Sequence, residues 1–523
     1  MAHLQPLARS LQEQLIGARK ERELAEAVNA RGTLIQTPKT GRKLASAYEH
    51  FRNVAEYTEE HLLLQHAIRR FYTRDIFLTG RELETIGQEL IVELTLAGYL
   101  KNNSVSTEAA AAIQRLVQDA MQTYGELRQA HIPRDQASRW ILDILSVQTE
   151  ELLNPHGHLR AIIYVAYQHY LRLFPRQKLV QTAKEDAHYE LSLYIAIHQA
   201  LLKSDEALVR HDLLQLHAQD AHQTKAFVAF NQNIDHLYAA PFTLRLRRAV
   251  SRYGAPFRVL KELADNRTDL AEILDDREEF LRAYRRQVEH EYKRVKQRLN
   301  QGIIRSLLFL LITKVFIGVA VEIPYDLLLV GHVALLPLTL NLLFPPCYIA
   351  SLRFMLRLPT QANAAALSET IDEILFASQA PTNTDALRLG LRKLSLGAQL
   401  VYSVLFLIPL ISIMALLRLL DFSFLQGVIF FIFLSTASFL GLRLSRIIRE
   451  LEIVDKSSGF LTSAADFFYL PFMLMGQWLS GKYARLNAVA FFMDLAIELP
   501  LKTGLRLVRQ WTSFLREKRD EIM

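Results

Sequence analysis

The spacing of apolar and polar positions along the chain changes near residue 300. Before that point, apolar residues recur at three- and four-residue intervals among Arg, Glu, Gln and His, with no convincing alternation of the kind that marks strands. From Ile303 onward, long uncharged runs appear. The pattern predicts an all-α protein. We expect a soluble helical domain over 1–268, a charged juxtamembrane helix over 269–302, a membrane domain over 303–444 and an amphipathic interfacial region over 445–523.

The membrane domain is predicted from runs that approach the length needed to cross a bilayer, which is about 20 apolar residues. Four such runs cover 303–321, 327–344, 394–417 and 422–442. The second is expected to end at Pro345-Pro346, because proline interrupts the helical hydrogen bonds. The sequence therefore predicts a four-helix polytopic membrane domain.

Basic residues flank these runs on one side only. Lys and Arg precede the first and third runs and follow the second and fourth, whereas the turns at 322–326 and 418–421 carry little positive charge. The positive-inside rule then places both termini on the cytoplasmic side of a bacterial inner membrane, or on the matrix or stromal side of an organelle membrane. The formal net charge of +7 is explained by attraction to anionic lipid headgroups, so no nucleic acid partner is expected.

The juxtamembrane helix has a divided charge. Acidic residues dominate 269–280 and basic residues dominate 281–300, which suits the helix dipole. We expect this helix to run on into the first membrane span. Gly302 marks the position where a break would fall.

Polar residues within the first two runs form one candidate site. Lys314 and His332 are predicted to lie at similar depths, and Glu322 and Asp326 stand in the turn between the runs. One interpretation is a proton or ion site. The other, which we favour, is a lysine that extends toward the acids in the turn, together with a structural hydrogen bond.

The tail contains a second candidate surface. Residues 467–481 are uncharged but too few to cross a bilayer comfortably, which indicates an interfacial or re-entrant segment. An amphipathic helix follows it. The predicted lipid-facing interface comprises Trp478, Tyr483, Lys502, Arg506, Arg509 and Trp511.

Histidine and carboxylate motifs do not predict a metal site. Glu185 and His188 form one Glu-x-x-His pair, whereas a di-iron bundle needs two such pairs and two further glutamates. His211, His217 and His222 are not spaced to share one helical face. We therefore expect no metal and no cofactor.

Catalytic motifs are also missing from the sequence. It holds no glycine-rich phosphate loop, nucleophile elbow or HExxH motif, so an enzyme is not expected. Cys347 is the one cysteine, which excludes an intrachain disulfide, and a buried, inert thiol is predicted.

Three functions are compatible with this organisation. The leading hypothesis is a membrane-anchored scaffold that binds a protein partner, or further copies of itself, at the cytoplasmic face. The alternative is an oligomeric ion channel or transporter that uses the polar cluster at Lys314. The third is a membrane enzyme that acts on lipid through Asp466, Asp494 or Glu498.

Overall fold

The computed structural model describes residues 6–37, 42–56, 59–78, 83–217, 224–329, 331, 335–355, 359–377, 396–453 and 470–478. Every regular element in these ranges is helical, which confirms the all-α prediction, and one isolated bridge joins Leu34 to Ser106. The described residues fall into two compact units. The first contains the chain up to Phe280 and the C-terminal end of one later helix, from Asp372. The second contains Leu281–Ile371 and the described residues from 396 onward.

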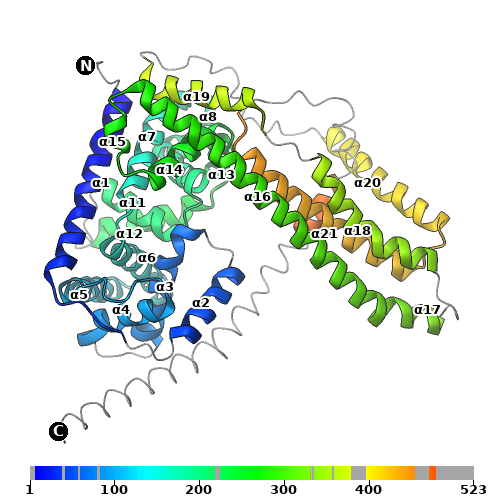
Figure 1. Cartoon of the computed structure of the whole chain (residues 1–523), viewed down its shortest axis with the longest axis horizontal. Helices are drawn as coiled ribbons and strands as arrows, with labels where there is room; N and C mark the ends of the chain where they lie inside the picture. Colours follow the sequence, from blue (N-terminus) through cyan, green and yellow to red (C-terminus); the bar gives the residue numbers. More distant parts are fainter. Residues whose placement is uncertain are drawn as a thin grey trace, which may run out of the picture. The chain divides into compact units, whose positions relative to one another are not determined.

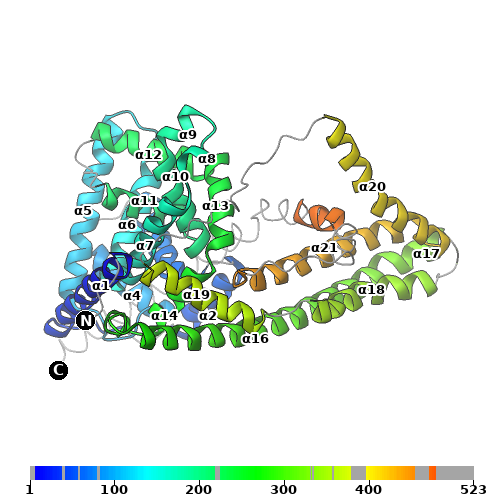
Figure 2. The same cartoon turned by 90° about the horizontal axis from the view of Figure 1, so that it is seen from above.

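The first unit is a bundle of helices and short helical turns (Figures 1 and 2). In chain order they are α1 (Pro6–Arg31), α2 (Arg42–Glu56), η1 (Glu60–Leu62), α3 (Leu63–Tyr72), η2 (Thr73–Leu78), η3 (Leu83–Thr85), α4 (Ile86–Ala97), α5 (Thr107–Gln129), α6 (Arg134–Leu153), α7 (Gly157–Leu173), α8 (Arg176–Leu179), α9 (Ala183–Ala187), α10 (Tyr189–Ile197), η4 (His198–Leu202), α11 (Glu206–Leu216), α12 (Thr224–Tyr238), α13 (Pro241–Tyr253), α14 (Ala255–Asn266) and α15 (Leu270–Ile273).

Local sequence signals fix several of these helices. Ser106 caps α5 by accepting a hydrogen bond from the Ala109 amide at 3.2 Å, and Asp205 caps α11 through the Leu208 amide at 3.0 Å. Gly157 opens α7 where α1 crosses it. A Cβ atom there would lie 2.7 Å from the Cβ of Ala18, so only glycine permits this approach.

A buried ionic hub joins α6, α11 and α12. The fully buried Arg210 donates to Asp143 at 3.0 Å, to Asp235 at 2.6 Å and to the Asn231 side chain at 2.7 Å. Trp140 donates to the same Asp235 carboxylate at 3.1 Å. A buried arginine needs several acceptors to offset the loss of its hydration, and this hub supplies them.

Helix α16 (Arg277–Ile317) begins in the first unit and continues in the second. It carries on through the π-helical segment η5 (Gly318–Glu322) into α17 (Ile323–Leu329). The predicted continuation into the first apolar run is therefore present, but Gly302 does not break it. A Cβ atom at Gly302 would lie 2.5 Å from Leu444 Cδ2, so this glycine instead allows two helices to pack closely.

The second unit also contains α18 (Leu335–Met355), α19 (Gln361–Phe376), which ends in the first unit, α20 (Leu396–Leu419), α21 (Phe424–Arg449) and a helical segment at 470–478. Helices α18 and α21 lie side by side (Figures 1 and 2). The predicted run 327–344 differs from what is observed. Its helix is interrupted after Leu329, near Gly331 with φ +82°, and α18 continues through both prolines although they lack N–H donors.

Two helical stretches, Arg277–Leu328 and Phe424–Arg449, are long and apolar enough to cross a membrane. Two shorter apolar helices cover Leu335–Ser351 and Phe406–Leu419. Large apolar side chains on the first stretch face outward: Ile312 is 66% exposed and Phe316 is 72% exposed. A surface of this kind is unfavourable in water and marks contact with another apolar phase or partner.

Candidate functional site

Five polar side chains meet inside the second unit. Lys314 comes from α16, Glu322 from η5, Asp326 from α17, Asn341 from α18 and Gln426 from α21. Each is at most 1% exposed. Elements that are far apart in the chain thus converge on one buried point, which we call the polar clasp.

An ion pair forms the centre of the clasp. The Lys314 ammonium donates to Glu322 Oε1, and it lies 4.9 Å from the centroid of the Phe433 ring. Asn341 Nδ2 donates to the other Glu322 oxygen at 3.1 Å and also lies 3.3 Å from the carbonyl oxygen of Gln426. Glu322 therefore binds a cation and an amide donor at once, which is what a buried carboxylate requires.

Gln426 completes the clasp at the start of α21. Its Nε2 donates to Asp326 Oδ2 at 2.8 Å, and its Oε1 accepts from the Ser423 amide at 3.0 Å. Ser423 accepts in turn from the Gln426 amide, so the two residues form a capping box. The same glutamine both caps α21 and joins it to α17.

The structure brings together three of the four residues predicted for this site. Lys314, Glu322 and Asp326 lie on one helical run, eight and four positions apart, so they share a face. The two acids were expected in an exposed turn, and the structure instead buries both in the helical wall. His332 lies outside the described residues. Lys314 reaches Glu322 within the unit and does not extend to a surface.

Asn341 and Gln426 belong to the site but were missed by the sequence reasoning. Both are strongly polar residues inside otherwise apolar runs, and such residues are costly there unless they have partners. That signal was present in the sequence. Their partners are residues from other helices, and pairings over 85 or 100 positions cannot be read from local spacing.

The charges of the clasp do not balance. Lys314 neutralises Glu322, which leaves the Asp326 carboxylate with an amide partner only. Among the described atoms, Asp326 Oδ1 and Asn341 Oδ1 have no hydrogen-bond partner. Asp326 and Asn341 therefore each keep one buried acceptor oxygen that no described donor reaches.

The tail segment 470–478 packs against α21. Phe472 is 1% exposed and stacks on Phe431 at 6.0 Å between ring centroids, and Gly476 leaves no room for a Cβ atom beside the Ser435 carbonyl. Trp478 is 64% exposed and borders an apolar pocket of about 330 Å³. The other predicted lipid-facing residues, Tyr483, Lys502, Arg506, Arg509 and Trp511, lie outside the described residues.

Two predictions about side-chain chemistry are resolved by the structure. Cys347 is exposed, so the expectation of a buried thiol was wrong. Glu185 accepts from Arg245 at 2.6 Å and from the Gln181 amide at 2.8 Å. Both oxygens of the glutamate in the Glu185–His188 pair thus have donors within the described structure.

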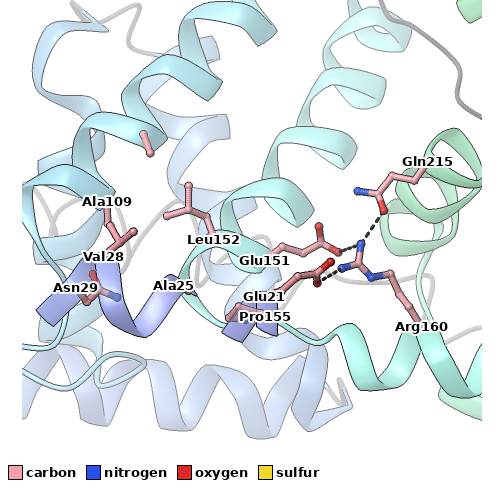
Figure 3. Close-up of a pocket in the computed structure, with 11 residues that line it drawn as sticks. Glu21, Ala25, Val28, Asn29, Ala109, Glu151, Leu152, Pro155, Arg160 and Gln215 are labelled. Atoms are coloured by element: carbon pink, nitrogen blue, oxygen red, sulfur yellow. Dashed lines mark hydrogen bonds and ion pairs between the residues drawn. The ribbon is translucent and has the colours of Figure 1, made fainter. Parts of the chain in front are cut away.

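The first unit contains a separate pocket of about 540 Å³, lined by residues of α1, α5, α6, α7 and α11 (Figure 3). Arg160 is its central polar group. The guanidinium reaches Glu21 at 3.2 Å, Glu151 at 3.1 Å and the Gln215 side-chain oxygen at 2.7 Å.

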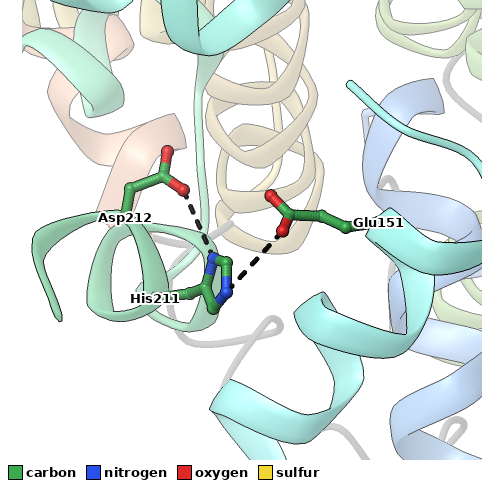
Figure 4. Close-up of side chains that lie close together, drawn as sticks. All are labelled: Glu151, His211 and Asp212. Carbon is green, nitrogen blue, oxygen red and sulfur yellow. Dashed lines mark hydrogen bonds and ion pairs between the residues drawn. The ribbon is translucent and has the colours of Figure 1, made fainter. Parts of the chain in front are cut away.

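His211 lies behind this pocket, between two carboxylates (Figure 4). Its Nδ1 is 3.4 Å from Asp212, and its Nε2 is 3.8 Å from Glu151. Burial raises the pKa of the Glu151 carboxyl and lowers the pKa of nearby His198. The sequence reasoning considered His211 only with other histidines and missed the two acids that flank it.

No protein family model, curated protein or solved structure shows significant similarity to this chain.

Proposed function

We propose that this protein is a membrane-anchored scaffold: the second unit holds it in the bilayer, and the first unit presents a helical surface to a protein partner. In this proposal α16–α17, α18, α20 and α21 cross the membrane, with both termini on the cytoplasmic side. At 1.5 Å per residue, the 17 apolar residues of α18 span about 26 Å, close to the thickness of a hydrocarbon core.

The observation that carries this proposal is the polar clasp. Its side chains bond mainly to one another, and none is more than 1% exposed. Such a network fixes how helices pack in an apolar medium, where polar side chains join helices to one another. A network that joins helices within the second unit suits an anchor for a scaffold better than it suits a conduit.

The proposed topology can be tested by labelling single cysteines. In a Cys347→Ala background, Asp421→Cys is placed in the turn between α20 and α21, and Gln122→Cys on the exposed surface of α5. A membrane-impermeant maleimide applied from outside should label Asp421→Cys in intact cells or vesicles, and Gln122→Cys only after lysis. Equal labelling of both sites before lysis would contradict the proposed topology.

The scaffold function itself is tested by isolating the full-length protein from its native membrane in mild detergent. We expect a protein partner in fixed stoichiometry. The charge-neutral clasp variant Lys314→Met/Glu322→Gln should retain this partner, because the first unit would make the contact. Recovery of the chain alone, or as a homo-oligomer without a partner, would contradict a hetero-protein scaffold.

The unbalanced charge at Asp326 supports a second candidate function, an oligomeric proton or cation channel or transporter. Here Asp326 would bind the ion, and Lys314 would set the charge of the site. Proteoliposome flux measured against pH tests this function. Asp326→Asn and Lys314→Met should alter the flux, whereas Thr313→Val, which alters a neighbouring half-buried residue outside the clasp, should not. Absence of flux, or flux unaffected by both clasp variants, removes this candidate.

A further inference from the structure

Beside the pocket of the first unit lies a histidine held between two acids, and the pocket-lining residues Glu151 and Gln215 both approach it. Glu151 comes from α6, and His211 and Asp212 come from α11. One ligand atom from each of the three residues lies within 4.8 Å of the others. A cluster of this kind is often only a salt-bridge network. The hydrogen bonds around it show which of its atoms have a free electron pair for a metal ion.

Those hydrogen bonds fix the tautomer of His211. Gln215 Oε1 faces Arg160, which can only donate, so the amide nitrogen of Gln215 must face His211 Nε2, 3.2 Å away. Because that nitrogen also only donates, Nε2 is the unprotonated acceptor. The proton then sits on Nδ1, which faces Asp212.

This arrangement places two electron-pair donors toward one point. The Nε2 lone pair of His211 and Glu151 Oε2 lie 3.8 Å apart, too far for a hydrogen bond between them. Ligand atoms in a tetrahedral zinc site are about 3.4 Å apart, given bonds of about 2.1 Å. A closure of about 0.4 Å would bring both atoms into the coordination range of one ion.

Asp212 has the position of an outer partner for such an ion. A metal-binding histidine usually donates its other N–H to a carboxylate, which fixes the ring and makes it a better ligand. Asp212 also faces His198, a fully buried histidine whose Nε2 lies 3.5 Å away and has no hydrogen-bond partner among the described atoms.

The surrounding charges favour a cation. Glu21, Glu151 and Asp212 contribute three negative charges and Arg160 one positive charge, for a local balance of −2. Arg160 binds Glu151 Oε1 and leaves Oε2 on the side of His211. Glu151 also lines the pocket, so its carboxylate lies at the boundary between the pocket and the cluster.

We propose that His211 Nε2 and Glu151 Oε2 bind a divalent transition-metal ion of the Zn²⁺ type beside this pocket, with Asp212 as the positioning residue behind His211. Water completes the coordination, and the Gln215 amide moves off Nε2. This site is independent of the function proposed for the second unit.

Cobalt binding to the full-length protein in detergent tests the proposal, because Co²⁺ replaces Zn²⁺ and has a visible spectrum that reports its ligands. The chelator-treated native protein should bind one Co²⁺, which Zn²⁺ displaces. His211→Ala and the isosteric Glu151→Gln should each abolish the spectrum, while Asp212→Asn should weaken binding about 10- to 100-fold. His188→Ala, which alters the other histidine–carboxylate motif, should bind as the native protein does.

Three results would overturn the proposal. The native protein could bind no Co²⁺, in which case His211 only takes part in hydrogen bonds and ion pairs with its neighbours. The spectrum could survive in both His211→Ala and Glu151→Gln, or it could disappear in His188→Ala, which would place the ion elsewhere. Circular dichroism of each variant separates loss of the site from loss of the fold. Glu151→Gln is the safer variant in this respect, because it leaves the side-chain volume nearly unchanged.

Discussion

The Lys314–Glu322 ion pair gives the most specific prediction about stability. Lys314→Met keeps much of the side-chain volume but removes the cation, so Glu322 remains buried with Asn341 as its one other hydrogen-bond donor in the described structure. Removing one partner of a buried ion pair typically costs about 3–5 kcal/mol. We expect about 3 kcal/mol here, because Asn341 still donates to Glu322 and the carboxyl can take up a proton.

The double variant Lys314→Met/Glu322→Gln separates the ion pair from simple packing. A glutamine at position 322 is neutral, and its oxygen can still accept from Asn341 Nδ2. Replacement of both members of a buried pair is often close to neutral. The double variant should therefore be about 2 kcal/mol more stable than Lys314→Met alone.

The assay is unfolding of the full-length protein in mixed micelles as the fraction of sodium dodecyl sulfate is raised, followed by circular dichroism. Thr313→Val is the matched control, since Thr313 bonds only within its own helix, to the Phe309 and Leu310 carbonyls, and its change should stay within about 0.5 kcal/mol. The reasoning is refuted if Lys314→Met matches Thr313→Val, or if the double variant is as unstable as the single one.

Three further predictions follow from close packing and burial. Gly302→Val should destabilise the protein by about 1–3 kcal/mol, since its side chain would overlap Leu444, and Leu444→Ala should restore part of the loss in the same unfolding assay. Gly476→Ala should separate segment 470–478 from α21, because a Cβ atom there would overlap the Ser435 carbonyl. In a Cys347→Ala background, cysteines introduced at Met475 and Ile432, which line one pocket, should then cross-link less efficiently than they do with Gly476. Unchanged cross-linking would count against this packing. Burial lowers the pKa of His169 to about 4 from 6.5, so its contribution to stability is complete above pH 6.5 and is lost as pH falls from about 6.5 to about 4. The slope is at most about 1.4 kcal/mol per pH unit; His169→Gln should flatten it, and the exposed His290→Gln should not.

The sequence predicted the helical class and the apolar half of the chain, because these depend on local spacing. The continuous helix across residue 300 was also predictable, since nothing between Arg277 and Ile317 terminates a helix. The structural role of Gly302 was not predictable. A glycine can break a helix or allow another helix to pack closely, and the residue that packs against Gly302, Leu444, is remote in the chain.

The clasp shows where local spacing stops being informative. Lys314, Glu322 and Asp326 were recognised as an unusual group, but the first two apolar runs were divided at the wrong place. The turn was assigned to the acidic residues before Pro324, whereas the helix continues to Leu329. Pro324 directly follows the π-helical segment η5, in which the backbone hydrogen-bond pattern changes. The helix therefore continues past a proline that, by local spacing, was expected to end it.

The pocket in the first unit was beyond sequence reasoning for a different reason. His211 and Asp212 are adjacent, and helical periodicity does not place adjacent residues on one face. They come together with Glu151 because α6 lies against α11, a tertiary contact.

The most direct test of the central claim is photo-cross-linking of the full-length protein in its native membrane. A photoreactive phenylalanine analogue would replace Leu24 or Gln122, which are exposed on the first unit, and Leu308 or Phe316, which are exposed on the second. We expect a defined protein adduct from at least one position on the first unit, and only lipid or self-adducts from the second. Adducts to a foreign protein from the second unit alone would contradict the claim that the first unit presents the functional surface.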